Sequence, residues 1–477
     1  MKSKKLDNNY YKELINLNKV FIQISSVSNK INQPTFVIGG YVRDLLLKRQ
    51  SEDIDIVTLG SGISLAKEVE KEIKCNKISI FKNFGTAMIK NNAFELQFVG
   101  ARKESYRKNS RNPIVENGSL EDDQKRRDFT INALAIGLND DKKGILIDPF
   151  NGIKDLEKKI IKTPLDPDIT FSDDPLRMMR AVRFSAQLNF DIEELTFKGI
   201  VKNSERIKIV AQERITEELN KIILSKHPSK GFKLLDQTGL LELIFPEFHN
   251  LKGVEIIDGN GHKDNFYHTL KVLDNILPLS KNNLWLRWAA ILHDIAKPKT
   301  KRYHPKNGWT FHGHEDKGAR MVPGIFKKFK LPLDEKMRYV QKLVLLHLRP
   351  ISLTNEKITD SALRRLLFEA GNDVEDLLKL CKSDITSKNK EKVNRYLKRF
   401  EKVDEKLKEV EERDRIKNWQ PPIDGKEIME TYNLGPCKEV GLLKEAIKNA
   451  ILDGEIENNY NEAKKLMEVT AIKMGIK

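Results

Sequence analysis

The sequence has little cysteine and no long apolar run. Its three cysteines, Cys75, Cys381 and Cys437, are far apart and odd in number, which argues against a disulfide framework and a CxxC metal site. The basic N-terminus lacks the apolar stretch of a signal peptide. The apolar run at 284–292 contains Arg287 and is too short to span a bilayer. These absences predict a cytoplasmic protein with no membrane-spanning segment.

Acidic residues are the minority among the charges. Asp and Glu number 69 against 85 Lys and Arg, so the net charge of the 477 residues is +16. A positive excess favours a polyanion such as nucleic acid, or less often an anionic membrane surface. A lysine-rich composition without a partner is the alternative explanation. The length indicates more than one domain, because a single core stops growing at roughly 250–300 residues.

Strand signals are confined to the first third of the chain. Residues up to about 150 contain short β-like runs with glycine turns, and helical periods lie between them. From about 152 onward amphipathic helices follow one another, and prolines separate them. The stretch 389–415 is dense in Lys, Glu and Arg and predicts a solvated helix. The fold class expected is therefore α+β, with a mixed N-terminal part and a mostly helical remainder.

A strand-to-helix turn with two glycines follows the first β-like run. The segment Phe36–Lys48 predicts a strand, the pair Gly39–Gly40 and a helix over 41–48. Glycines at a helix N-terminus let backbone N–H groups approach a phosphate, and Arg43 can add a charge-assisted hydrogen bond. A Gly-Gly turn is more often plain turn chemistry, so this motif alone is weak evidence for a phosphate site.

Two aspartates alternate along the next predicted strand. Asp53 and Asp55 share one face, and Ile54 and Ile56 share the opposite, buried face. Carboxylates about 7 Å apart along a strand suit one or two hard divalent cations. Glu95, on a later strand, could add a third carboxylate, and two metals held this way activate a 3′-hydroxyl and neutralise a triphosphate. A solvent-facing strand end explains a lone Asp-x-Asp equally well.

A basic cluster next to an acid stands at a later element boundary. Arg126 and Arg127 could grip phosphates while Asp128 accepts a hydrogen bond from a ribose hydroxyl. A solvated turn is the commoner explanation of such a cluster.

Arginines recur at regular spacing in the segment 173–184. Pro175 suits the first helical position and the aspartate before it suits the N-cap. One aspartate and three arginines then follow at intervals of three, a ladder that drifts by about 60° per step, and Phe184 is expected on another side. Aspartate accepts and arginine donates in a planar fork, so together they could read base edges and phosphates. The ladder consists of Asp174, Arg177, Arg180 and Arg183.

Taken in order, these motifs resemble those of class II tRNA nucleotidyltransferases, the family of CCA-adding enzymes and bacterial poly(A) polymerases. One departure is that the arginine-ladder motif opens with Asp173–Asp174, where the family usually has Glu-Asp. The matching segments are GGYVRD at 39–44, DID at 53–55, RRDFTINALA at 126–135, DDPLRMMRAVRF at 173–184, ERITEEL at 213–219 and GPCKEVGLL at 435–443.

The resemblance implies a role for each matching residue. Asp53 and Asp55 would bind Mg2+. Glu95 lies outside the matching motifs, and its expected role of orienting the attacking hydroxyl follows from the strand pattern alone. The triphosphate would be held by Gly40, Arg43, Arg126 and Arg127, and the ribose by Asp128. Asp174 and Arg177 would choose the incoming base as a protein template, with Arg180 and Arg183 assisting. CTP, ATP and the tRNA acceptor arm are the partners implied. Whether the loop between Tyr106 and Leu120 supports the switch from C to A addition stays open.

Most of the nine histidines fall between residues 249 and 347. An adjacent His–Asp pair at the end of an apolar helix, with other His and Asp arriving from separate helices, indicates a mixed imidazole–carboxylate metal set. Any one of these histidines could instead be a structural residue. The pattern resembles the HD phosphohydrolase superfamily. That resemblance implies a divalent metal of unknown identity bound by His268, His293, Asp294 and Asp384, with His314 and His347 supporting a second.

Four regions are implied by the two resemblances together. They are a polymerase-β-like nucleotidyltransferase head (1–155), a helical neck that binds nucleotide and RNA (156–250), an HD metal-binding domain (251–388) and a helical RNA-binding tail (389–477). The function expected is CCA addition to tRNA. The alternatives are A-only addition, CC-only addition, poly(A) synthesis, and an HD phosphohydrolase whose head is an RNA-binding module.

Overall fold

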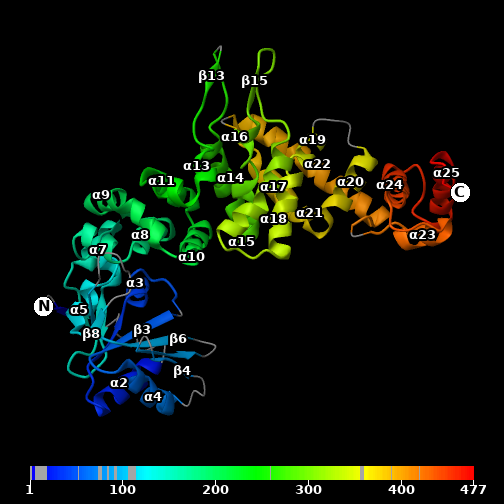
Figure 1. Cartoon of the computed structure of the whole chain (residues 1–477). Helices are drawn as coiled ribbons and strands as arrows, with labels where there is room; N and C mark the ends of the chain where they lie inside the picture. Colours follow the sequence, from blue (N-terminus) through cyan, green and yellow to red (C-terminus); the bar gives the residue numbers. More distant parts are fainter. Residues whose placement is uncertain are drawn as a thin grey trace. The chain divides into compact units, whose positions relative to one another are not determined.

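The computed structural model divides the chain into two compact units, Met1–Phe245 and Pro246–Lys477 (Figure 1). Cys75 and residues 106–113 of the loop before Leu120 lie outside the described residues. Within the described part, no helix is both long and apolar enough to cross a membrane. The structure describes residues 3–5, 19–51, 53–73, 78–82, 85–90, 94–105, 114–257, 259–354, 359–387, 389–417 and 419–476.

The N-terminal unit is built on a mixed sheet of eight strands. The strands are β1 (Ser3–Lys5), β2 (Thr35–Ile38), β3 (Asp53–Thr58), β4 (Ile78–Phe81), β5 (Thr86–Lys90), β6 (Glu95–Gly100), β9 (Ala135–Gly137) and β10 (Ile145–Ile147). Their order is β1-β10-β9-β2-β3-β6-β5-β4. Strands β3 and β6 pair in parallel, whereas the other neighbours in this order pair antiparallel. A separate antiparallel pair is formed by β7 (Arg102–Ser105) and β8 (Ile114–Asn117).

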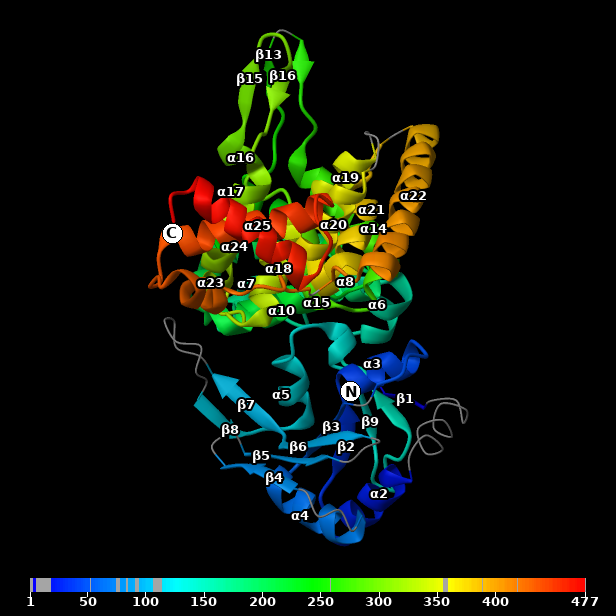
Figure 2. The same cartoon turned by 90° about the vertical axis from the view of Figure 1, so that its right-hand side faces the viewer.

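The two faces of strand β3 differ in polarity, as the alternation predicts. Ile54 and Ile56 are fully buried, on the side covered by helices α2 (Val20–Lys30) and α4 (Gly62–Ile73) (Figure 2). Their neighbours Asp53 and Asp55 therefore point to the opposite face.

Short helices complete the N-terminal unit and carry the arginine motifs. In the head they are α3 (Gly40–Leu46), α5 (Leu120–Lys125), η2 (Thr130–Asn132) and α6 (Gly152–Lys158). The helices that follow are α7 (Pro167–Asp173), α8 (Leu176–Leu188), α9 (Glu194–Asn203), η3 (Ser204–Ile209), α10 (Gln212–Ile223), α11 (Pro228–Gln237) and α12 (Leu240–Ile244).

The C-terminal unit is mainly helical, and its apolar helix α15 packs against α14, α18 and α21. The apolar sequence of α15 is almost entirely buried, including Trp288, and Nε of Arg287 donates a 2.9 Å hydrogen bond to Oγ of Ser280. The helices are α13 (Pro246–His249), α14 (Asn265–Ser280), α15 (Leu284–Leu292), α16 (Lys297–Thr300), α17 (His314–Lys328), α18 (Glu335–Leu346), α19 (Arg349–Leu353), α20 (Asp360–Ala370), η4 (Gly371–Asp373), α21 (Val374–Asp384), α22 (Lys390–Asp414), α23 (Gly425–Tyr432), α24 (Lys438–Asp453) and α25 (Tyr460–Lys473).

The end of the chain has a small core of its own. Helices α23, α24 and α25 enclose buried side chains that include Ile428, Leu443, Ile447 and Met467. The helix expected over 389–415 is present as α22. Its charged residues are mostly exposed, as expected for a solvated helix, but one side is buried through Phe400, Val403, Leu407 and Val410.

Several short strands after residue 152 escaped the sequence analysis. They form the pairs β11 (Ile160–Ile161) with β12 (Asp191–Ile192), β13 (Ile256–Ile257) with β14 (Asn260–Gly261), and β15 (Arg302–His304) with β16 (Gly308–Thr310). Runs of two or three residues are too short to show an alternation of polarity. The α+β fold class is confirmed: a mixed sheet in the N-terminal unit precedes a mostly helical chain.

Candidate functional site

One cavity of about 900 Å³ in the N-terminal unit collects the residues that the sequence singled out for nucleotidyl transfer. It is bordered by the sheet, by the N-terminus of α3 and by helix α8, so residues far apart in sequence meet there. The predicted residues that line it are Gly40, Arg43, Asp53, Asp55, Glu95, Arg126, Arg127, Asp128, Asp174, Arg177, Arg180 and Arg183.

Three carboxylates on neighbouring strands line this cavity: Asp53, Asp55 and Glu95. The parallel register of β3 and β6 sets Asp53 beside Glu95 and Asp55 beside Gln97. Burial raises the pKa of Asp55; the Arg127 guanidinium opposes this rise and the charge of Asp53 adds to it. Nζ of Lys90 lies 2.7 Å from Oε2 of Glu95. The oxygen ligands Asp53 and Asp55 suit Mg2+, because a divalent cation offsets both the burial of Asp55 and its repulsion by Asp53.

The turn before α3 brings an arginine up to these acids. Gly39 has φ 84° and ψ −139°, a conformation that favours glycine. A Cβ on this residue would lie 2.7 Å from Nη1 of Arg127 and 3.0 Å from Oδ2 of Asp55. A side chain at position 39 would therefore collide with Arg127 and Asp55. This close approach requires glycine at position 39 rather than at position 40.

Asp123 fixes both arginines of the basic pair and was missed by the sequence analysis. Its carboxylate is fully buried. Oδ1 accepts hydrogen bonds from Arg126, the shorter being 2.6 Å, and Oδ2 accepts one of 3.2 Å from Nε of Arg127. Although burial opposes ionisation, the two guanidinium groups lower the pKa of Asp123. The i, i+3 and i, i+4 spacing from Asp123 to the two arginines was the signal in the sequence.

A second buried acid joins the basic cluster to helix α8. Oδ2 of Asp128 accepts a 2.7 Å hydrogen bond from Nε of Arg180, and Oδ1 accepts one of 3.0 Å from Nδ2 of Asn132. Despite its burial, Arg180 and Asn132 lower the pKa of Asp128 to about 2. Arg177 donates a 2.6 Å hydrogen bond to the backbone oxygen of Arg126. The predicted phosphate and base contacts are thus held together by direct hydrogen bonds.

Asp174 caps helix α8 from one residue further away than expected. The helix begins at Leu176 with Pro175 as its N-cap, while Oδ1 of Asp174 accepts a 3.1 Å hydrogen bond from the Leu176 amide. Its other oxygen, Oδ2, lies 3.4 Å from Nη2 of Arg214 on α10. Both oxygens of the predicted template aspartate are therefore oriented by the protein.

Phe184 lies among the arginines, and the expectation that it faces away from them was wrong. The guanidinium carbons of Arg183, Arg43 and Arg180 lie 3.9, 4.9 and 5.5 Å from its ring centre. Residues i and i+4 share a helix face, which places Phe184 on the face of Arg180.

Two of the predicted nucleotide ligands are already engaged by the protein. Arg43 pairs with both oxygens of Asp44, and its Nη1 donates a 2.8 Å hydrogen bond to Oδ1 of Asn132. Arg183 is buried, and its Nε lies 2.5 Å from Oε2 of Glu218. The drift of the ladder turns Arg183 toward the interior, so its guanidinium orders the wall of the cavity.

A second group of predicted residues meets in the C-terminal unit. His268 lies in the first turn of α14, His314 begins α17, and Asp384 ends α21. His293 and His347 directly follow α15 and α18, and Asp294 comes next to His293. Two sets of candidate ligand atoms cluster here, His268, His293 and Asp294 in one and Asp294, His314 and His347 in the other.

The imidazole Nε2 atoms of this cluster converge on two carboxylates. Nε2 of His268 lies 2.9 Å from Oδ1 of Asp384, and Nε2 of His293 lies 3.2 Å from Oδ2 of Asp294. On the other side of Asp294, Oδ1 lies 3.2 Å from Nε2 of His314 and 3.9 Å from Nε2 of His347. Nε2 of His293 and Oδ2 of Asp294 are buried without a well-aligned hydrogen bond among the described residues, and Nζ of Lys297 lies 2.6 Å from the same Oδ2. This oxygen therefore attracts a cation, which is the ammonium group of Lys297 in this structure.

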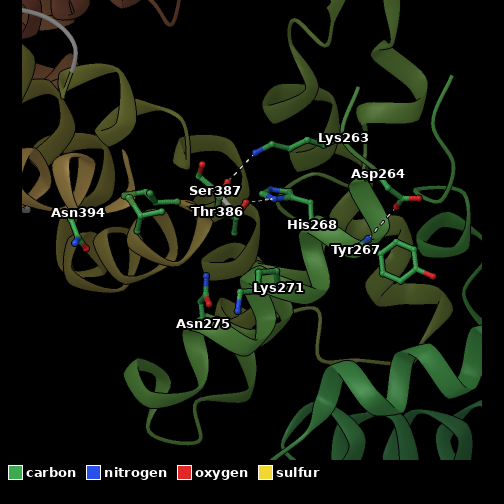
Figure 3. Close-up of a pocket in the computed structure, with 11 residues that line it drawn as sticks. Lys263, Asp264, Tyr267, His268, Lys271, Asn275, Thr386, Ser387 and Asn394 are labelled. Carbon is green, nitrogen blue, oxygen red and sulfur yellow. Dashed lines mark hydrogen bonds between the residues drawn. The ribbon is translucent and has the colours of Figure 1, made fainter. Parts of the chain in front are cut away.

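The other ring nitrogen of each histidine is held by the protein. Nδ1 of His293, His314 and His347 lies 2.7–2.8 Å from a backbone oxygen three residues earlier. Nδ1 of His268 instead faces Oγ1 of Thr386 at 2.8 Å (Figure 3). Fixing Nδ1 in this way is typical of metal-binding histidines, because it orients the ring and frees Nε2 for the metal.

Charges in this cluster agree with a cation site. Burial disfavours a charged imidazole at His293, yet Asp294 and Asp384 outweigh it and raise the pKa of His293 to about 10. Burial and the charge of His293 lower the pKa of His347 to about 4. The carboxylates therefore attract positive charge, and His347 offers the neutral ring that a metal requires.

Two adjoining cavities open beside His268. The larger, of about 880 Å³, is lined by Lys263, Lys271 and the segment 385–387 (Figure 3). The smaller, of about 500 Å³, also reaches Asp384. A ligand could therefore approach the His–Asp cluster past several lysines.

Family models match three stretches of the chain. They describe a poly A polymerase head domain over residues 35–162, a probable RNA and SrmB-binding site of polymerase A over 189–252, and an HD domain over 265–384. The A-adding tRNA nucleotidyltransferase of Deinococcus radiodurans is 31% identical over 350 residues, which cover 71% of this chain and 76% of that protein. The chain belongs to the tRNA nucleotidyltransferase family. Both resemblances seen in the sequence are thereby confirmed.

Other relatives in this family align over shorter shares of their length. The A-adding tRNA nucleotidyltransferase of Aquifex aeolicus is 30% identical over 72% of this chain and 44% of its own. The CCA-adding enzyme of Lactobacillus helveticus is 38% identical over 49% of this chain and 57% of its own. The chain thus spans about half the length of these two relatives.

Solved structures share the fold of this chain at low sequence identity. The Bacillus stearothermophilus CCA-adding enzyme in complex with CTP has a TM-score of 0.65 and 23% identity, over 96% of this chain and 99% of that one. The Thermotoga maritima CCA-adding enzyme complexed with tRNA has a TM-score of 0.60 and 20% identity, over 98% and 100%. The polymerase-like head followed by helical regions is therefore a known fold.

Proposed function

We propose that this chain adds nucleotides from CTP and ATP to the 3′ end of tRNA and completes the CCA sequence. The observation that carries the proposal is that the residues predicted for nucleotidyl transfer line one cavity. The charge of Arg127 acts on Asp55, and hydrogen bonds link Arg127 through Asp123 to Arg126 and Arg177. Metal, triphosphate and base contacts would thereby be held at fixed positions relative to one another, as positional catalysis requires.

Asp53, Asp55 and Glu95 would hold Mg2+ at the point of bond formation. When bound, the metal would neutralise the triphosphate and make the attacking 3′-hydroxyl more acidic. Asp53 and Asp55 share the strand face that carries these charges, and Glu95 would orient the hydroxyl from the neighbouring strand.

The arginines would divide the binding of the nucleotide between them. Arg126 and Arg127, fixed by Asp123, would contact the triphosphate together with the backbone at Gly40. Asp174 and Arg177 would pair with the base edge, and a wrong base would leave their hydrogen bonds unmade. Asp128, Arg180, Arg43 and Arg183 would position these groups through the contacts described above.

Single-nucleotide incorporation tests this proposal. Three tRNA transcripts, ending before CCA, after C and after CC, are incubated with CTP or ATP alone. We expect C on the first two and A on the third, and Asp53→Asn with Asp55→Asn should abolish both. Asp140→Asn with Asp141→Asn removes the same charge from an exposed loop and should leave both activities intact. Failure of the wild-type protein to extend all three transcripts refutes the proposal.

The same assay separates the alternative products. A on the third transcript without C on the first two identifies an A-adding enzyme, and C without A identifies a CC-adding enzyme. Long A tails on a 3′ end that is not tRNA identify a poly(A) polymerase.

A second activity, hydrolysis of phosphate esters, is favoured by the converging Nε2 atoms of the C-terminal unit. We propose that His268, His293, Asp294 and Asp384 hold one divalent cation and that His314 and His347 support a second. A bound cation would neutralise the phosphate there. Lys263, Lys271 and Lys297 line the adjoining cavities and would attract it.

Titration calorimetry with Mn2+ and hydrolysis of bis(p-nitrophenyl) phosphate test this second activity. His293→Ala with Asp294→Ala should lose both metal binding at this site and hydrolysis, and should keep nucleotide addition. His312→Ala, an exposed histidine of the same unit, serves as the control. Loss of nucleotide addition together with hydrolysis would contradict two separate sites.

The remaining assignments follow from the proposed function. We propose a nucleotidyltransferase head over 1–155, a neck over 156–250, a metal-binding HD domain over 251–388 and an RNA-binding tail over 389–477, acting in the cytoplasm. The boundary of the compact units at Phe245 and Pro246 falls close to the proposed end of the neck.

A further inference from the structure

Two hairpins project side by side from the helices of the C-terminal unit (Figures 1 and 2). The first consists of β13 and β14 and leads into α14; the second consists of β15 and β16 and lies between α16 and α17. We call the four strands together the hairpin arm. Neither hairpin supplies a residue of the His–Asp cluster, and the functions proposed above assign no residue of the four strands.

Aromatic and charged contacts join the hairpins into one body. The ring of His262 lies 5.4 Å from Trp309 and 5.7 Å from Phe311. Nζ of Lys301 lies 2.8 Å from Oε1 of Glu255 on the first hairpin and 4.4 Å from the ring centre of Trp309 on the second. The arm is therefore a defined surface rather than two independent loops.

The charged residues in and around the second hairpin are all basic. Residues 297–312 contain four lysines and one arginine and no acidic residue. Arg302, His304 and Lys306 are exposed, and no described residue forms an ion pair with Arg302 or Lys306. Exposed positive charge without a protein partner is what a polyanion requires.

The base of the arm borders the cavities beside the His–Asp cluster. Lys297 and Phe311 line the smaller cavity, and Lys263, just after the first hairpin, lines both. Nζ of Lys263 donates a 2.9 Å hydrogen bond to the backbone oxygen of Thr386 (Figure 3). Positive charge therefore continues from the exposed strands to the mouth of the cluster.

An apolar edge on the first hairpin complements the charge. Val254, Ile256 and Ile257 are 47%, 70% and 38% exposed. Such side chains can pack on ribose and base surfaces beside a phosphate backbone. They also suit a protein or lipid surface. Lys297 and Lys301 are paired with acids, but Lys299, Arg302 and Lys306 are exposed without an ion pair among the described residues, and their spacing favours a polyanion.

We propose that the hairpin arm binds the phosphate backbone of RNA, with Arg302 and Lys306 as its outermost phosphate contacts. The identity of that RNA as tRNA rests on the proposed function, whereas the binding itself rests on the arm. The arm then holds an RNA chain so that it passes the opening of the His–Asp cluster.

Salt-dependent binding of the full-length protein to a labelled tRNA transcript without CCA tests the proposal. Each phosphate contact changes the slope of log Kd against log salt by about 0.9 for duplex and about 0.7 for single strands. Arg302→Ala with Lys306→Ala should therefore lower the slope by about 1 to 2 and raise Kd roughly ten- to a hundredfold at 0.1 M KCl. Lys67→Ala with Lys71→Ala removes the same charge from exposed positions on α4 and should change neither quantity.

Unchanged Kd and slope in the arm variant overturn the proposal. The proposal is also overturned if the arm variant loses binding to phosphatidylglycerol vesicles while its RNA binding stays intact, because the arm would then be a lipid-binding surface. Equal melting temperatures of wild type and variant exclude unfolding as the cause. Wild-type protein that binds RNA through the arm and adds no nucleotide overturns the proposed function alone. Wild-type protein that adds CCA while the arm variant keeps its affinity overturns this inference alone.

Discussion

Nδ1 of His268 is held by the side-chain hydroxyl of Thr386, 2.8 Å away and from another segment of the chain. The three other histidines of the cluster use backbone oxygens within their own turns. A hydroxyl is therefore the one partner of these four rings that a substitution can remove without moving the backbone.

Thr386→Val should weaken metal binding in the C-terminal unit. Valine has the shape of threonine without the hydroxyl, so His268 loses the contact that orients its ring. Loss of such a partner lowers metal affinity by about 10- to 100-fold, measurable by calorimetry with Mn2+. Thr386→Ser should retain the affinity, and nucleotide addition should be unaffected in both. Equal affinities for the valine and serine variants would contradict this role.

Asp128→Asn should destabilise the N-terminal unit in a pH-dependent way. Because the folded pKa of about 2 lies below the unfolded value, the ionised carboxylate stabilises the fold above about pH 4, and this contribution is lost as the pH falls toward 2. The difference amounts to about 2 kcal/mol at neutral pH. All four tryptophans lie beyond residue 245, so tryptophan fluorescence does not report on the N-terminal unit. Hydrogen exchange at the backbone amides of β9 is therefore the suitable measurement. The exchange difference from wild type should shrink between pH 4 and pH 2. Asp140→Asn is the exposed control, and a constant difference would exclude this cause.

Phe184→Leu should weaken nucleotide binding for CTP and ATP alike. The ring lies against three guanidinium groups, and each contact contributes roughly 0.5–2 kcal/mol. We expect KM to rise about tenfold for both nucleotides, with a smaller change in kcat. Phe184→Tyr keeps the aromatic face and should stay near wild type. Phe190→Leu, at a buried phenylalanine whose ring has no guanidinium over it among the described residues, controls for lost packing. A rise confined to one nucleotide would point to base selection instead.

Arg214→Ala should reduce discrimination between the two nucleotides. Oδ1 of Asp174 caps helix α8, and Arg214 orients the other carboxylate oxygen, Oδ2. Without it the acceptor moves, and the preference for the correct base should fall about three- to tenfold, equivalent to about 1 kcal/mol. Competition between CTP and ATP on one transcript measures the ratio. Glu217→Ala, exposed on the same helix, should leave the ratio unchanged.

Local sequence patterns predicted those features of the site that depend on a single helix or strand. The shared face of Asp53 and Asp55 follows from strand alternation, and the order of the arginine motifs carried the family resemblance. The expectation that Glu95 joins them agrees with the register of β3 and β6, although that register is a long-range property. The helix over 389–415 followed equally well from its charge pattern.

Other features depend on contacts that leave no local pattern. Thr386 is separated from His268 by most of a domain, so their hydrogen bond has no spacing to search for. From its apolar character alone, Phe184 was expected on a side of α8 away from the arginines. In the structure, the guanidinium groups of arginines from α3 and α8 lie around its ring. The hairpin arm is built from strands of two or three residues, below the length at which alternation indicates a strand.

The parallel register of β3 and β6 also bears on how the chain folds. Asp53 and Glu95 become neighbours only after the intervening chain, with α4, β4 and β5, has closed a loop of about 40 residues, and such non-local pairing is slow. A slip of one residue would turn Glu95 to the buried face of the sheet. Asp53 and Asp55 share a face of β3 through strand alternation alone, so the correct register is what adds Glu95, the third carboxylate that lines the cavity.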